Sequence, residues 1–168
     1  YFDNTAQDPS LDWLRVGGAD LLAQALGRWQ DLSVVDAERL LDLTRKADIP
    51  VGRRLSQNDV LALAREAGMW TATLGSVVRV RDSLTVTVKA YDVADRSQLL
   101  SASVTVPEKG DLPAAFRQLA GKILDVAGAP KNGLADVEPP TRSLAAYQAY
   151  IEGIQLRSRW AIDSAVTA

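Results

Sequence analysis

The segment from Leu55 to Val93 constrains the fold most, because the spacing of its apolar residues changes once, from helical to strand-like. Ser56 is a typical N-cap, and Asp59 adds a carboxylate where the helix dipole favours one. Apolar residues then recur at helical spacing, at Val60, Leu61, Ala64 and Ala67. Gly68 ends the predicted helix, since glycine adopts the left-handed conformation without steric cost. None of these residues carries a reactive group, so we interpret the segment as structural scaffold.

From residue 72 onward the apolar residues alternate, which is typical of half-buried strands. The first predicted strand has Ala72, Leu74, Ser76, Val78 and Val80 on one face, with Thr71, Thr73, Val77 and Arg79 on the other. The second has inward residues Leu84, Val86, Val88 and Ala90, and outward residues Thr85, Thr87 and Lys89. A third, about Gln98 to Val106, sets Leu100, Ala102, Val104 and Val106 against Ser101, Ser103 and Thr105. An apolar face opposite a Thr/Ser/Arg face predicts a sheet that helices cover on one side.

Helical patterns flank this meander. The first carries Leu14, Gly18, Leu21, Leu22, Ala25 and Trp29, with Gly17 and Gly18 as a potential break. Asp36 caps a second, with Leu40, Leu41 and Leu43, and Asp111 caps a third, about 112–127. The run Leu32 to Val35 is predicted as a buried strand. We therefore expect an α/β chain of the α+β two-layer sandwich type, with a mixed sheet, an antiparallel three-stranded meander and helices on one face.

The C-terminal quarter differs in character. Residues 129–143 are rich in turn formers and predict a linker, which separates a domain at 1–128 from a helical segment at 144–168. Leu144, Tyr147, Tyr150 or Ile151, and Ile154 share one side of this helix. Such a helix cannot bury its apolar face alone, so we expect it to dock on the domain or on another chain.

Composition narrows the function. The chain has no histidine and no cysteine, which removes the commonest general base and metal ligand and any thiolate or disulfide. Its formal charge is −2 and its pI about 5.2, which argues against nucleic-acid binding by bulk electrostatics. No apolar run reaches the roughly 20 residues that span a bilayer. We predict no catalytic residue, no cofactor site, no metal site and no direct membrane contact.

Two surfaces remain as candidates. Arg53, Arg54, Arg79 and Arg81 could form a weak basic patch, but ordinary surface charge offset by nearby acids explains them more simply. Candidate partner contacts lie on the C-terminal helix, at Tyr147, Tyr150, Ile154 and Trp160. Trp160 is the best candidate for an exposed anchor.

The residues from Leu63 to Ser101 resemble the middle of the TolB amino-terminal-like domain of bacterial multidomain signalling proteins. The resemblance involves Gly68, the pair Gly75 and Ser76, and the corner at Asp92. The opening segment from Tyr1 resembles the family's Pro-Phe-x-Asn segment, with Tyr1 in place of proline and without the hydrophobic strand that normally precedes it. The string "AYQAYIEG" resembles the start of a tetratricopeptide (TPR) repeat, with Gly153 and Ala165 at the separation of its small positions.

The resemblance implies a non-catalytic interaction or sensory module that positions a TPR array for a protein partner. It also implies a membrane-anchored parent protein with an output domain such as a kinase or cyclase, and favours the extracytoplasmic side. Self-association through the incomplete repeat is a further expectation. The alternative is a domain that senses a small-molecule ligand, for which we expect an apolar pocket with a few convergent polar groups.

Overall fold

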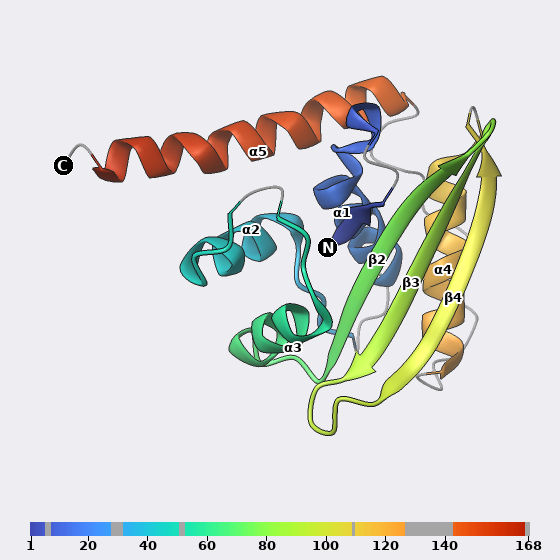
Figure 1. Cartoon of the computed structure of the whole chain (residues 1–168), viewed down its shortest axis with the longest axis horizontal. Helices are drawn as coiled ribbons and strands as arrows, with labels where there is room; N and C mark the ends of the chain where they lie inside the picture. Colours follow the sequence, from blue (N-terminus) through green and yellow to red (C-terminus); the bar gives the residue numbers. More distant parts are fainter. Residues whose placement is uncertain (6–7, 28–31, 51–52, 109, 127–142, 167–168) are drawn as a thin grey trace.

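A four-stranded mixed sheet forms the centre of the protein (Figure 1). The computed structural model describes residues 1–5, 8–27, 32–50, 53–108, 110–126 and 143–166. The strands are β1 (Phe2–Asn4), β2 (Thr71–Val80), β3 (Ser83–Asp92) and β4 (Gln98–Pro107), in the spatial order β1-β2-β3-β4. β1 is parallel to β2, and the other pairs are antiparallel. The predicted α+β architecture with its meander is confirmed.

Helices surround the sheet unevenly. A short 3-10 turn (Pro9–Leu11) leads into α1 (Leu14–Leu26), which is followed by α2 (Ala37–Lys46), α3 (Gln57–Glu66), α4 (Leu112–Val126) and α5 (Leu144–Val166). Figure 1 shows α1 and α4 behind the sheet and α5 across the top of α1 and α2. α3 lies beside the start of β2 and contributes to a second apolar cluster, which takes in Ala72 and Tyr91.

Local sequence explains where the helices begin. Ser56 and Asp59 form a reciprocal capping box at the start of α3, which satisfies two backbone N–H groups. Hydrogen bonds from the Ser56 backbone N–H and hydroxyl hold the pKa of Asp59 below its ordinary value of 3.8. Asp36 accepts from the Arg39 N–H and Asp111 from the Ala114 N–H. Gly68 has φ +72° after α3, so the predicted stop is confirmed.

Phe2 links the two layers. Its ring lies against Gly75 of β2 and packs edge-to-face on Phe116 of α4, with centroids 5.2 Å apart. Phe2 is 2% exposed, and the main core around it combines buried residues of α1, α4 and the sheet, among them Leu14, Val77, Val86, Val88 and Leu119.

The expected inward face of β2 is wrong. Gly75 and Val77 lie opposite Val88 and Val86, so they share the helix-covered face, and Val77 is buried. Leu74, Ser76 and Val78 instead share the other face with Lys89, Thr87 and Thr85. Because β2 carries valines on both faces, its own sequence does not show which face the helices cover. The apolar residues of β3 all lie on one face, and pairing with β3 therefore decides which face of β2 is buried.

Three further sequence predictions concern a strand, a helix break and a linker. Residues 32–35 form no strand, and none of the four is buried, so the predicted buried strand is wrong. Gly17 and Gly18 do not break α1, because packed aromatic rings lie against both. The linker and domain boundary predicted around 128–143 fall, apart from Ser143, outside the described residues, as does Trp29.

Gly75→Ala should destabilise the fold by about 1–3 kcal/mol, because an added Cβ would stand 2.3 Å from two ring carbons of Phe2. Chemical denaturation measures the change in the free energy of unfolding. Gly153→Ala is the matched control: it adds the same methyl group to a helix interior where nothing lies within 4 Å. It should leave stability unchanged or raise it by up to about 1 kcal/mol. Equal effects of the two substitutions would contradict the close packing of Phe2 on β2.

Candidate functional site

One face of α5 is buried against the domain. The rings of Trp13 and Tyr147 pack edge-to-face, and Ile151 is fully buried. The Tyr147 hydroxyl donates to Asp20 Oδ2 at 2.5 Å, and burial followed by this carboxylate raises the pKa of Tyr147 well above its ordinary value. Ile154 is buried as well, and Arg157 forms an ion pair with Glu38 of α2. Tyr147 and Ile154, predicted as partner contacts, are therefore used within the chain.

The outer face of α5 is exposed and partly apolar. Tyr150 is 56% exposed and Leu156 59% exposed, and Gly153 between them has open space around its Cα. These three residues recur every third position and so lie along one side of the helix. Trp160 belongs to the same helix, but its side chain is outside the described part of the chain.

The four arginines of the predicted basic patch do not act as free cations together. Arg53 pairs with Asp59 at 2.5 Å, and Arg54 with Asp3 at 2.9 Å. Arg79 pairs with Asp8 at 2.6 Å and with Glu108 at 3.2 Å. Arg81 is exposed in the β2–β3 turn, with φ +53°. Carboxylates next to three of the four guanidinium groups agree with the interpretation as ordinary surface charge.

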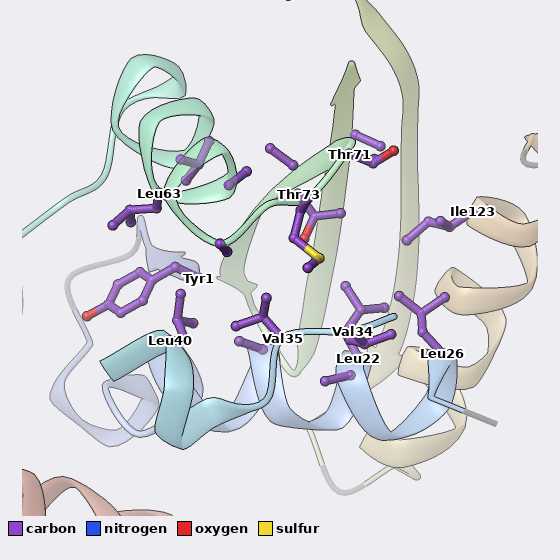
Figure 2. A pocket seen from close by; sticks show the side chains of 18 of the residues that line it. Tyr1, Leu22, Leu26, Val34, Val35, Leu40, Leu63, Thr71, Thr73 and Ile123 are labelled. Atoms are coloured by element: carbon purple, nitrogen blue, oxygen red, sulfur yellow. The ribbon is translucent and has the colours of Figure 1, made fainter. Parts of the chain in front are cut away.

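An apolar groove of about 320 Å³ lies between β2, α1, α3 and the chain at 32–35 (Figure 2). Its walls include Leu22 and Leu26 of α1, Leu63 of α3, and Ile123 of α4. Val34 and Val35 face Thr71 and Thr73 of β2 across the opening, and Tyr1 stands at one end. No side chain among the described lining residues is charged. Such a site favours an apolar occupant.

The amino group of Tyr1 is poorly solvated at this end of the groove. Burial lowers the pKa of the Tyr1 ammonium group from its ordinary value of 8.0 to about 6. The charged form is therefore unfavourable here, whereas an uncharged group at the same position would carry no such cost.

Sequence reasoning missed both the groove and one exposed aromatic residue. The groove is assembled from segments far apart in the chain, so no local pattern indicates it. Trp70 is 87% exposed just before β2. The pairing of the Val93 N–H with the Trp70 carbonyl fixes its backbone.

The described residues offer no constellation for metal chemistry, since no three Asp or Glu side chains gather closely enough to hold an ion. None of the helices in the described ranges combines the length and apolarity needed to cross a bilayer.

Comparison with known proteins gives only distant structural similarities. The chain matches no known protein family and no curated protein. It is similar to the LpoB C-terminal domain from Salmonella enterica, with 14% identity, a TM-score of 0.44, and coverage of 50% of this chain and 63% of that one. It is also similar to TolB from Acinetobacter baumannii, with 17% identity, a TM-score of 0.44, and coverage of 76% of this chain and 26% of that one. For a PelC dodecamer from Paraburkholderia phytofirmans the identity is 18% and the TM-score 0.43, and the match covers 77% of this chain and 84% of that one. Functional arguments therefore rest on this chain's own residues.

Stability of the 168-residue chain should fall as the pH falls from 8 to 6. The pKa of the Tyr1 amine is about 6 in the folded chain against 8.0 ordinarily, so the unfolded chain binds more protons in this window. The free energy of unfolding should decrease by about 2 kcal/mol across it. The chain has no histidine and no cysteine, whose ordinary pKa values lie nearest this window. Acetylation of the Tyr1 amine is the control and should abolish the dependence; an unchanged slope would show that another group titrates.

Tyr147→Phe should loosen α5 by about 1–2 kcal/mol, because it removes the hydroxyl that donates to Asp20. Amide hydrogen exchange in α5 should accelerate while that of β3 stays unchanged. The matched control is Tyr150→Phe, which removes the same hydroxyl from a ring that is 56% exposed. Equal amide exchange rates of α5 in the two variants would show that the hydrogen bond from Tyr147 to Asp20 does not hold α5 on the domain.

Proposed function

We propose that this chain is a non-catalytic protein-interaction module in which α5 presents the contact surface. One observation carries the proposal: α5 buries Tyr147, Ile151 and Ile154 in the domain, while Tyr150 and Leu156 stay exposed around the open position at Gly153. A helix whose two sides are both apolar is suited to lie between two packed layers. The domain provides one layer, and a partner provides the other.

The partner on this surface is an amphipathic helix. A glycine between two larger apolar residues lets a second helix approach closely, which is the packing that paired repeat helices use. The resemblance of this segment to a TPR repeat supports the same occupant, supplied by an adjoining repeat or by another protein. Tyrosine at the centre of such a contact is a typical binding hot spot.

The setting follows from the resemblance stated above. The chain would act as a protein-binding part of a bacterial regulatory protein, on the extracytoplasmic side. Lack of cysteine makes the fold independent of the redox state of the compartment.

The test compares proteins retained by the immobilised chain and by two double variants. Tyr150→Glu with Leu156→Glu places charges on the outer face of α5, and Ser101→Glu with Thr105→Glu places the same charges on exposed positions of β4. The purified partner should bind the wild type and the β4 variant alike. It should bind the α5 variant at least about tenfold more weakly, because one buried aromatic anchor contributes about 2 kcal/mol or more.

Sedimentation of the chain alone shows whether the partner is a second copy. Retention of every captured protein irrespective of the α5 charges would contradict the proposal, as would tight binding of a metabolite with no protein partner.

A small-molecule sensor is the second candidate, and the apolar groove is the observation that favours it. Its discriminating experiment is a thermal-shift screen, in which a bound metabolite should raise the midpoint in a concentration-dependent way.

A further inference from the structure

β4 is an outer strand of the sheet, and none of its ten residues is charged. Figure 1 shows it at the side of the sheet opposite β1, with α4 behind it. The ladder with β3 fixes which backbone groups point outward. The Glu108 N–H donates to the Asp82 carbonyl at 2.8 Å, so this pair and every second pair along the ladder is hydrogen-bonded. The N–H and C=O groups of the intervening residues Ser101, Ser103 and Thr105 therefore point away from β3.

The outer side of β4 is open for further pairing. None of the other strands in the described part of the chain lies beside it, and the side chains of Ser101, Ser103 and Thr105 are exposed. The hydroxyl groups of Ser103 and Thr105 bond to those of Thr87 and Thr85 within the sheet, at 2.8 and 3.0 Å. These bonds hold the side chains over the sheet face, away from the outward backbone groups. An uncharged edge strand of this length is a template for another extended chain.

Lys122 of α4 decides which chain this edge favours. Its exposed side chain reaches β4 from the helical layer, and Nζ donates to the Ser103 carbonyl at 3.1 Å. Antiparallel pairing of β4 with a second copy, centred on Ser103, would bring two Lys122 ammonium groups together. Like charges directly opposite one another destabilise a strand pair. A chain that places a carboxylate at the same point gains an attraction instead, so the charge at this edge favours an acidic partner over a second copy.

We propose that the outer edge of β4 binds an extended segment of a protein partner, antiparallel to β4, with a carboxylate side chain opposite Val104. In such a ladder the partner residue opposite Ser103 exchanges both backbone hydrogen bonds with it. The partner residue before that one lies opposite Val104, on the side of the sheet that α4 covers. Lys122 then turns from the Ser103 carbonyl to this carboxylate. Partner residues opposite Leu100 and Val106 lie on the same side and are apolar, because both neighbours pack against the main core.

This edge is a second contact surface and uses no residue of α5. An edge strand takes up an extended chain, whereas the outer face of α5 takes up a helix. Main-chain hydrogen bonds supply the affinity of strand addition, and alternate side chains supply its specificity. A substitution at one surface therefore leaves binding at the other unchanged.

The experiment uses four capped peptides of one design. The first, Val-Thr-Glu-Thr-Val-Thr-Val, places Glu opposite Val104 and the following Thr opposite Ser103. The second carries Lys in place of Glu. The third is N-methylated at the Thr after Glu, whose N–H would bond to the Ser103 carbonyl. The fourth is N-methylated at the next Val, whose N–H points away from β4, and is the matched control. Fluorescence anisotropy measures their affinities for the 168-residue chain.

The Glu peptide and the control methylated at Val should bind alike, and the other two should bind about tenfold or more weakly. The Glu peptide should slow amide exchange at Ser103 and Thr105, whose N–H groups point outward. It should leave exchange at Val104 unchanged, because that N–H already faces β3. Lys122→Glu should reverse the preference between the Glu and Lys peptides, and the substitution lies at an exposed position of α4.

Equal binding of the two N-methylated peptides would overturn the proposal, because an added strand requires the backbone donor that faces β4. Unchanged exchange at Ser103 with the Glu peptide at about 1 mM would overturn it as well. A preference for Glu that persists in the Lys122→Glu variant would show that Lys122 does not select the partner. A wild-type dimer that the Glu peptide dissociates would assign the edge to a second copy, which also contradicts the proposal.

Discussion

The contact of Phe2 with Gly75 is the constraint on which the rest of the structure depends. β1 has only three residues, so backbone pairing alone would hold it weakly. The missing side chain at Gly75 lets the Phe2 ring lie directly on β2, where it also meets Phe116 of α4. One aromatic side chain thereby joins the sheet to the helical layer and fixes the register in which Tyr1 faces the groove.

The two candidate surfaces have different physical origins. The outer face of α5 exists because the helix is apolar on more than one side, and the domain covers only the side with Tyr147, Ile151 and Ile154. The groove forms where α1, α3, α4 and residues 32–35 gather apolar side chains around the start of β2. The first surface is an exposed side of a helix, and the second is a concave apolar space between a sheet and three helices.

Sequence reasoning predicted elements well where local chemistry decides them. The caps at Asp36, Ser56 and Asp111 and the stop at Gly68 were predicted because each acts within one helical turn. It failed at residues 32–35, whose apolar run needs a neighbouring strand before it can become one. It also failed on the inward face of β2, because Val77 and Val78 make both faces plausible until β3 is paired.

The sequence by itself determined where α2, α3 and α4 begin, the antiparallel meander, and the absence of histidine and cysteine chemistry, since each depends on residue type and short-range spacing. Only the tertiary structure decided that Tyr147 and Ile154 turn inward, that acids neutralise Arg53, Arg54 and Arg79, and that the groove forms. Those outcomes depend on segments that meet from distant parts of the chain, and spacing along one segment carries no information about what will cover it.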